Sequence, residues 1–184
     1  MTVIGITGTD GAGKGTVVDY LVTNYGFVHY SSRTFITEAV LEKRLVPTRN
    51  QLRLTANELR AEYGDDFVVR QAYEQAARDG ATRIVIESIR AIAEAVFLKA
   101  QGGILLAVDA TPEIRYGRVQ TRRSTTDQVS YEEFLAHEAL ERNDPDPHGM
   151  QKAKVIKLAD YSIMNDASLA VLQQAVDGFI VNQL

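Results

Sequence analysis

The feature that most restricts the fold of this chain is its glycine-rich stretch at residues 8–16, which reads Gly-Thr-Asp-Gly-Ala-Gly-Lys-Gly-Thr. An apolar run at 3–6 precedes the stretch, and a segment of helical character follows it. This order of strand, glycine loop and helix, with Gly8, Gly13 and Lys14 at the required spacing, indicates a phosphate-binding loop. Glycines let the backbone N–H groups point at a phosphate, and the helix start adds the positive end of its dipole.

The loop contains the residues that we expect to bind the phosphates of a nucleotide. They are Gly8, Asp10, Gly11, Ala12, Gly13, Lys14, Gly15 and Thr16. Lys14 is placed to reach the outer phosphates as a point charge. The hydroxyl that usually follows this lysine directly comes one place later, at Thr16, because Gly15 intervenes. The alternative is a glycine turn beside an exposed lysine, and the agreement between spacing and flanking segments disfavours it.

Length and composition exclude several classes of protein. A chain of 184 residues is long enough for one domain with a substantial core. It contains no cysteine, so disulfides and thiol nucleophiles are excluded, and its net charge of −4 argues against general nucleic-acid binding. No apolar run approaches the roughly 20 residues that cross a bilayer, and the N-terminus lacks a signal-peptide layout. We expect a cytoplasmic protein without nucleic-acid or membrane partners, either a monomer or a homodimer.

The order of the other segments predicts the fold class. Apolar runs bounded by turn residues predict five strands, at 3–7, 27–30, 83–86, 104–108 and 161–164. Segments of helical period separate these strands, so the sheet is expected to be mostly parallel and flanked by helices. The result is a three-layer α/β fold of the P-loop NTPase type. Helix starts are predicted at Thr48, Pro112, Ser130 and Ser168, from capping boxes, a first-turn proline and an N-cap serine.

Several motifs resemble those of nucleotide kinases. The ending Gly-Lys-Gly-Thr is similar to that of the adenylate kinase type, and Asp-Gly-Ala-Gly-Lys is similar to the thymidylate kinase loop. The third predicted strand ends in Glu-Ser-Ile-Arg at 87–90, which resembles Asp-Gly-Phe-Pro-Arg of nucleoside monophosphate kinases. In length it matches Asp-Gly-Ile-Arg of archaeal adenylate-kinase-like P-loop proteins. Residues 159–169 look like the C-terminal signature of that group and are also similar to the end of dephospho-CoA kinases.

The resemblance implies an ATP- and Mg²⁺-dependent kinase, with one P-loop kinase domain over 1–184. Its acceptor-binding insertion would lie at about 31–80 and its lid at about 118–149, where the chain is longer than a plain crossover requires. The alternative is two surface excursions without catalytic meaning. The small nucleotide substrates would be ATP and a nucleoside or deoxynucleoside monophosphate.

The resemblance and the position of the third strand also suggest the magnesium ligands. A carboxylate at the carboxyl end of a central parallel strand lies beside the phosphate-binding loop. We expect Glu87 to hold magnesium, through water, together with Thr16, because magnesium keeps much of its hydration shell. The alternative for Glu87 is a strand-end carboxylate that caps the next helix. Arg90, three residues later, suits an acceptor phosphate.

The arginines are concentrated in one part of the sequence: thirteen of the fourteen lie between Arg33 and Arg123. Arg115, Arg118 and Arg122 recur at three- and four-residue steps, so they share a helical face. In the family that this chain resembles, such arginines lead into the lid and clamp the transferring phosphoryl group. We therefore assign Arg118 and Arg122, with Lys14, to catalysis. A solvated basic face is the alternative.

A second arginine face predicts the acceptor site. Arg49, Arg53 and Arg60 lie on one side of a predicted helix, with Asn57 alongside and an apolar stripe of Leu52, Ala56, Leu59 and Tyr63 next to them. The predicted acceptor contacts are Arg33, Arg53, Asn57, Arg60 and Arg90. Ser-Arg-Thr at 32–34 replaces the expected Thr-Gly-Asp, so adenylate specificity is not implied.

Two alternative functions remain at the level of sequence. A dephospho-CoA kinase should carry an Asp-x-Asp pattern in the segment after its first helix, with Asp as the base that deprotonates a sugar hydroxyl, and residues 26–32 contain none. A nucleotide-sensing module without efficient transfer would need fewer arginines. Lys152, Lys154 and Lys157 are interpreted as a small solvated basic face.

Overall fold

The computed structural model describes residues 1–122 and 129–184 and contains one parallel β-sheet. Its strands are β1 (Thr2–Gly8), β2 (Val28–Ser31), β3 (Arg83–Glu87), β4 (Ile104–Asp109) and β5 (Tyr161–Met164). The strand order is β2-β3-β1-β4-β5, and every neighbouring pair runs parallel. All five predicted strands are confirmed, each within one residue at either end. The loop after β1 therefore leaves the centre of the sheet.

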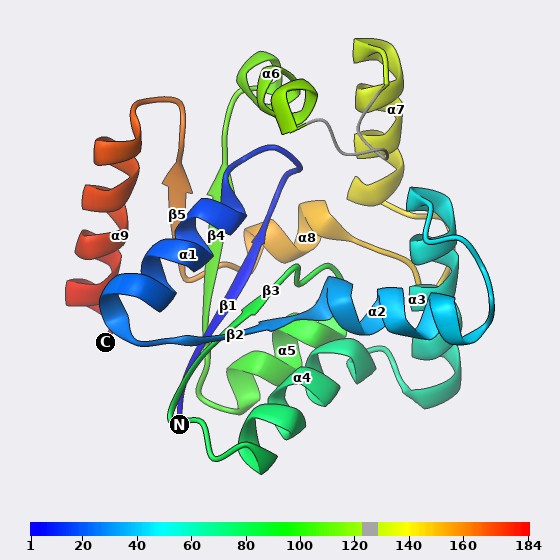
Figure 1. The fold of residues 1–184 in the computed structure, drawn as a ribbon, viewed down its shortest axis with the longest axis horizontal. Coiled ribbons are helices and arrows are strands. Elements are labelled where there is room, and N and C mark those ends of the chain that lie inside the picture. Colours follow the sequence, from blue (N-terminus) through cyan, green and yellow to red (C-terminus); the bar gives the residue numbers. More distant parts are fainter. Residues whose placement is uncertain (123–128) are drawn as a thin grey trace.

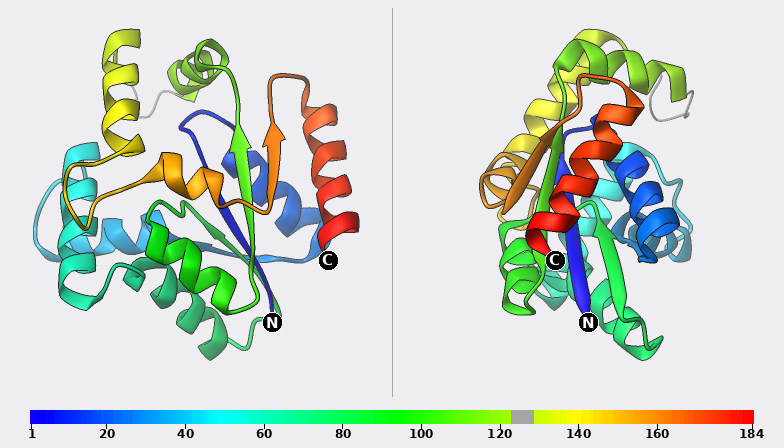
Figure 2. Two further views of the ribbon diagram at one scale, coloured as in Figure 1. Left: turned by 180° about the vertical axis from the view of Figure 1, so that it is seen from behind. Right: turned by 90° about the vertical axis from the view of Figure 1, so that its left-hand side faces the viewer.

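Helices connect the strands and cover both faces of the sheet (Figure 1). They are α1 (Lys14–Tyr25), α2 (Ser32–Glu42), α3 (Arg49–Tyr63), α4 (Phe67–Arg78), α5 (Ile92–Ala100), α6 (Pro112–Arg122), α7 (Tyr131–Arg142), α8 (Lys152–Lys157) and α9 (Leu169–Gln183). The helix α1 is on the viewer's side in Figure 1, whereas α5 and α8 are on the viewer's side in the reversed view of Figure 2. The expected three-layer α/β fold is confirmed.

The alternation of side chains along β1 divides the core between the two faces of the sheet. Ile4 and Ile6 pack with the buried residues of α1 and α9, among them Leu21 and Phe179. Val3 points the other way and packs with the apolar faces of α4, α5 and α8. Because both faces are covered, β1 is buried along almost its whole length and fixes the start of the glycine loop.

A third, smaller core holds α2, α3 and α4 together. Ile36, Ala56 and Val68 contribute one side chain from each helix, and Leu52 packs against them. This cluster supports the part of the predicted apolar stripe that contains Leu52 and Ala56, but Tyr63 at the end of the stripe is half exposed. The three helices follow the edge strand β2, so they form a wall beside the end of β3.

The predicted helix starts agree with the structure. Thr48 accepts a hydrogen bond from the Gln51 amide at 3.2 Å, and Ser168 caps α9 in the same way. Ser130 and Glu133 form a reciprocal capping box at α7. No helix within 1–122 or 129–184 is long and apolar enough to span a bilayer.

Candidate functional site

The glycine loop between β1 and α1 has a backbone that requires glycine at three positions. Gly8, Gly11 and Gly13 have φ angles of 132°, 81° and 96°, in a region that other residues rarely adopt. A side chain at Gly8 or Gly11 would also overlap neighbouring backbone, and one at Gly13 would overlap the Asn165 side chain. The sequence spacing of these glycines thus corresponds to a real constraint on the conformation of the loop.

Lys14 is the first residue of α1, and its side chain folds along the loop. The Nζ atom donates hydrogen bonds to the carbonyl oxygens of Thr9 at 2.7 Å and Gly8 at 3.3 Å. Burial lowers the pKa of Lys14 to about 8, although the nearby Asp10 carboxylate acts in the opposite direction. The ammonium is therefore held at the mouth of the loop, where a phosphate would compensate its burial.

Two residues that sequence reasoning did not assign to the site fix the outer side of the loop. Thr9 donates a hydrogen bond to the carboxylate of Asp109 at the end of β4. The amide Nδ2 of Asn165 donates to the Ala12 carbonyl at 2.8 Å, and the backbone N–H of Asn165 donates to the Asp109 carbonyl at 2.7 Å. The C-terminal motif quoted above contains Asn165, so the resemblance pointed at the segment without indicating its role.

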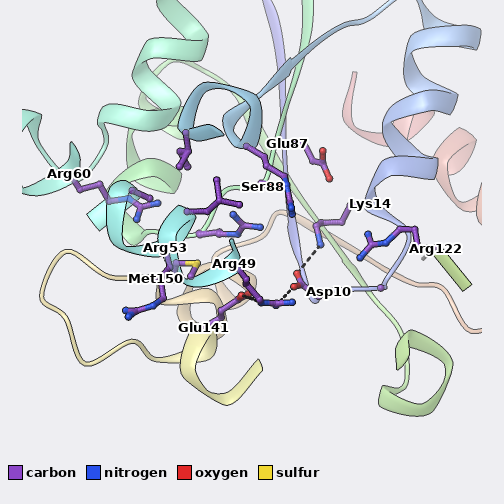
Figure 3. A pocket seen from close by; sticks show the side chains of 16 residues that line it. Asp10, Lys14, Arg49, Arg53, Arg60, Glu87, Ser88, Arg122, Glu141 and Met150 are labelled. Carbon is purple, nitrogen blue, oxygen red and sulfur yellow. Dashed lines mark hydrogen bonds and ion pairs between the residues drawn. The ribbon is translucent and has the colours of Figure 1, made fainter. Parts of the chain in front are cut away.

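Two cavities open on either side of Lys14. The first, here called the P-loop cavity, has a volume of about 390 Å³ and is lined by Gly11, Gly13, Lys14, Gly15, Thr16, Glu87, Arg118 and Arg122. The second, here called the α2–α3 cavity, has a volume of about 420 Å³. Gly11, Lys14, Glu87 and Arg122 line both cavities, so the two spaces meet at these residues. Figure 3 shows Lys14 between Glu87 and Arg122 in this junction.

Glu87 and Thr16 both lie at the P-loop cavity and offer oxygen atoms. Burial opposes the ionisation of Glu87, but the nearby His29 side chain and the charges of Lys14 and Arg90 lower its pKa below the ordinary value. The Nε2 atom of His29 lies 3.6 Å from the Glu87 carboxylate. The carboxylate is thus ionised at neutral pH and beside the phosphate-binding loop.

The α2–α3 cavity brings together most of the predicted acceptor contacts. Its lining includes Arg33, Arg53, Arg60 and Arg90, together with Ile36, Leu52, Ala56 and Met150 as an apolar wall. Asn57 is buried behind this lining and is not part of it. The cavity therefore combines basic side chains with an apolar wall.

Three of the cavity arginines, Arg49, Arg53 and Arg60, are paired with carboxylates from distant parts of the chain. Arg53 Nη1 lies 2.8 Å from the buried carboxylate of Asp144. Arg60 makes two hydrogen bonds to Glu94, and both side chains are at most 2% exposed. These pairs mean that α3 presents less free positive charge than its sequence indicates. Arg90 differs, because its guanidinium has no carboxylate partner among the described residues; its buried Nε, like that of Arg53, also lacks a hydrogen-bond partner there.

Arg49, Asp10, Glu141 and Lys152 form a network at the floor of the α2–α3 cavity. Arg49 contacts both carboxylates, and Lys152 Nζ lies 3.0 Å from Asp10 and also donates to Glu141. Burial alone would raise the pKa of Asp10, but the charges of Lys152, Lys14 and Arg49 hold it well below the ordinary value. The interpretation of Lys152 as a solvated residue is wrong, since its side chain is 4% exposed.

The predicted arginine face of α6 divides in the structure. Arg118 and Arg122 line the P-loop cavity, and one buried terminal nitrogen of Arg118 has no partner in the described part of the chain. Arg115 instead points into the interior, where it makes paired hydrogen bonds of 2.7 and 3.0 Å to Glu138 of α7. Its inclusion in a phosphate clamp is therefore wrong, because a buried partner 23 positions away neutralises it.

The segment that follows α7 contacts α3 and the residues just before α4. Besides the pair of Arg53 with Asp144, His148 Nδ1 is 2.7 Å from Asp65, just before α4. Met150 then lines the α2–α3 cavity. The part of the expected lid at 123–128 lies outside the described residues. The described residues of the 118–149 region thus contribute to both cavities: Arg118 lines the P-loop cavity, Glu141 lines the α2–α3 cavity, and Arg122 lines both.

Fold and loop together define a P-loop kinase-like domain, and comparison with known proteins agrees. A profile described as "AAA domain" matches residues 4–144. A UPF0200 protein of Staphylothermus marinus is 30% identical over 165 residues, which cover 89% of this chain and 83% of the relative. A UPF0200 protein of Hyperthermus butylicus is 29% identical over 168 residues, with coverages of 91% and 87%. The chain therefore belongs to the AAA domain family and to the UPF0200 proteins.

Solved structures share the fold over the whole chain. TT1252 from Thermus thermophilus has a TM-score of 0.66 at 24% identity, and covers 100% of this chain and 98% of its own. Shikimate kinase from Bacteroides thetaiotaomicron has a TM-score of 0.65 at 15% identity, with coverages of 100% and 99%. At these identities the likeness shows the kinase-like architecture and not the substrate.

Proposed function

We propose that this protein transfers the γ-phosphoryl group of ATP to a nucleoside or deoxynucleoside monophosphate. The observation that carries the proposal is the meeting of two cavities at Lys14, Glu87 and Arg122. Phosphoryl transfer requires the donor and the acceptor phosphates to be in line, with cations around the phosphoryl group that is transferred. The P-loop cavity would take the donor, and the α2–α3 cavity would take the acceptor.

The distribution of charge in the α2–α3 cavity gives the acceptor an orientation. Arg49, Arg53 and Arg60 are neutralised by their carboxylate partners, whereas the Arg90 guanidinium has no carboxylate partner among the described residues. The phosphate of the acceptor would therefore lie at the Arg90 end, next to Lys14. The organic part would extend toward the apolar wall that includes Met150.

The carboxylates of the α2–α3 cavity favour an acceptor that is already ionised. Asp10, Glu87 and Glu141 line the cavity, and the pKa of each is below its ordinary value, because cations nearby outweigh the effect of burial. A hydroxyl acceptor requires a base to remove its proton, and bases of low pKa engaged in ion pairs serve poorly. A phosphate acceptor needs no such base. This argues against dephospho-CoA kinase activity and against a shikimate-like alcohol as the acceptor.

The residues at the P-loop cavity fit magnesium. Glu87 and Thr16 offer oxygen atoms, which magnesium prefers, and no group of three or more His, Asp or Glu side chains within the described residues could hold a metal. The protein would thus provide few of the ligands, and water and phosphate oxygens the rest. Bound magnesium would neutralise charge on the ATP phosphates.

The chain's own groups would then stabilise the transfer. An oxygen of the acceptor phosphate forms a bond to the γ-phosphorus, while the bond to the bridging oxygen of ADP breaks and ADP leaves with that electron pair. Lys14 and the loop amides would hold the donor phosphates, and Arg118 and Arg122 would neutralise charge on the transferring phosphoryl group. We also propose that about 31–80 is the acceptor-binding insertion, because it lines the α2–α3 cavity, and that about 118–149 is the lid, because it contains Arg118 and Arg122.

The direct test is a panel of ribo- and deoxyribonucleoside monophosphates with ATP and magnesium, with formation of the diphosphate measured for each. We expect turnover of at least one monophosphate, and loss of at least about 10³-fold in kcat/KM for Lys14→Met. Dephospho-CoA and shikimate are included as hydroxyl acceptors. Tight ATP binding with no turnover of any monophosphate would overturn the proposal in favour of a nucleotide-sensing module.

A further inference from the structure

The segment 87–91, which brings Arg90 into the α2–α3 cavity, is held rigidly by its surroundings. Ser88 adopts a left-handed conformation with φ of 73°, which is unusual for a residue other than glycine. Its backbone N–H donates to the Ile6 carbonyl at 3.0 Å, and the Arg90 carbonyl accepts from the Gln151 amide at 2.8 Å. A strained backbone of this kind persists only where neighbours over-determine it.

Glu94 also contacts the backbone of this segment. Its Oε2 atom accepts hydrogen bonds from the backbone N–H groups of Arg90 at 2.8 Å and Ala91 at 2.9 Å. These two residues directly precede α5, and Ala91 is its N-cap, so the carboxylate also compensates the positive end of that helix. One oxygen of Glu94 thus fixes the backbone of the residue that we assign to the acceptor phosphate.

The other carboxylate oxygen of Glu94 accepts hydrogen bonds from Arg60. Oε1 accepts from Nε and Nη2 of Arg60 at 2.9 and 2.8 Å, and the two side chains are 1% and 2% exposed. An ionised carboxylate in such an environment is strongly unfavourable without a partner charge. The guanidinium of α3 therefore allows Glu94 to remain buried and bonded to the backbone of 90–91.

The donors of Arg60 are largely engaged, which separates it from Arg90. Two of its nitrogens bond to Glu94, and the third lies 3.4 Å from the Asn57 side-chain oxygen. Arg90, in contrast, keeps a buried Nε without a partner in the described part of the chain. Of these two side chains, only Arg90 has a buried nitrogen that lacks any hydrogen-bond partner among the described residues.

We propose that Arg60 and Glu94 form a positioning pair, which orients Arg90 toward the acceptor phosphate without contacting that phosphate. The inference rests on the proposed function. It changes the role expected for Arg60, from a direct acceptor contact to a support that acts through Glu94. It also couples α3 of the acceptor side to the end of β3, where Glu87 lies between the two cavities.

A double-mutant cycle tests this pair. Arg60→Met, Glu94→Gln and the double variant are assayed for KM of the monophosphate with the highest kcat/KM in the panel above. Each single variant should raise that KM by about 10- to 100-fold, because a small displacement of a positioning group weakens binding strongly. The double variant should stay within about threefold of the worse single variant, because both changes remove the same support. The Kd of a fluorescent ATP analogue should change less than about twofold in all three, since the P-loop cavity does not include either residue.

Arg53→Met is the matched control. Arg53 lies on the same helix and lines the same cavity, but its partner is Asp144. Its effect on KM should multiply with that of Glu94→Gln, as expected for residues without a shared partner. If the effects of Arg60→Met and Glu94→Gln also multiply, Arg60 contacts the acceptor itself and the positioning role is wrong.

Amide hydrogen exchange separates this inference from the proposed function. Arg60→Met should accelerate exchange at the amides of Arg90 and Ala91 as much as Glu94→Gln does. This expectation holds even if no monophosphate is a substrate, and inorganic phosphate titrated by calorimetry then replaces the KM measurement. Unchanged exchange at both amides in folded Arg60→Met would overturn the pair regardless of turnover.

Discussion

Lys14 shows how a single residue of the loop can report nucleotide binding through its proton. Burial lowers its pKa to about 8, from an ordinary value of 10.5, so the ammonium is partly deprotonated in mildly alkaline solution. Phosphate oxygens close to Nζ favour the charged form and raise the pKa again. The ATP complex thus binds more protons than the free protein between pH 8 and the pKa of the complex.

The first prediction follows from this difference. At pH 8.5, ATP binding should take up a fraction of a proton, and the affinity for ATP should fall as the pH rises through this range. Calorimetry in buffers of different ionisation enthalpy measures the uptake. Lys14→Met should abolish it, and Lys43→Met, a change at an exposed lysine paired with Glu58, should leave it unchanged. Equal uptake by Lys14→Met would mean that another group titrates.

At the scale of elements, two glycines on either side of Lys14 differ in whether the backbone requires glycine. Gly13 has a φ of 96°, and a side chain there would meet Asn165. Gly15 lies inside α1, and a Cβ at this position would have no atom within 4 Å. Glycine inside a helix is less favourable than alanine by about 1 kcal/mol.

We therefore expect Gly15→Ala to raise the free energy of unfolding by about 0.5–1 kcal/mol and Gly13→Ala to lower it by at least about 1 kcal/mol. Urea unfolding monitored by circular dichroism measures both. Gly178→Ala, at another helical glycine with open space around its Cβ, is the reference for the helix effect alone. Destabilisation by Gly15→Ala would show that the first turn of α1 is strained.

The same elements show what the sequence could predict. Strand positions, the parallel direction of the strands and the helix caps follow from local patterns of apolar residues and turn residues, and these predictions agreed with the structure. Helical periodicity also placed Arg53 and Arg60 at one cavity. It could not supply their partners, because Asp144 and Glu94 lie 91 and 34 positions away in the sequence. Arg115 was assigned to the wrong surroundings for the same reason, since Glu138 belongs to another helix.

At the scale of the whole molecule, the Arg49–Asp10–Glu141–Lys152 network joins four segments. Asp10 comes from the glycine loop, Arg49 begins α3, Glu141 lies in α7, and Lys152 begins α8. Figure 3 shows Arg49 between Asp10 and Glu141 at the edge of the α2–α3 cavity. The glycine loop, α3 and the end of the predicted lid are thus connected by one set of ion pairs. The sequence indicated Asp10 as a loop residue and Arg49 as part of an arginine face, but it could not indicate that both join one network with Glu141 and Lys152.

The network predicts how stability depends on pH. The pKa values of Asp10 and Glu141 are lower in the folded protein than in the unfolded chain, because the cations outweigh burial. Their contribution is complete above the unfolded values of about 4 and is lost as the pH falls toward the folded values. Wild-type protein should therefore lose stability below about pH 4 more steeply than Asp10→Asn.

At neutral pH, Asp10→Asn should lower the free energy of unfolding by about 2 kcal/mol, because Arg49 and Lys152 lose a charged hydrogen-bond partner. Urea unfolding at a series of pH values between 3 and 7 measures both effects. Asp19→Asn, at an exposed residue of α1, should run parallel to wild type across the series. An equally steep acid loss in Asp10→Asn would place the responsible carboxylates elsewhere. A shallower acid loss in Asp10→Asn would show that the charge of Asp10 helps to hold the loop, α3 and α7 together. Because this network includes a residue of the glycine loop and lines the α2–α3 cavity, acid should then weaken the binding of ATP and of the acceptor together.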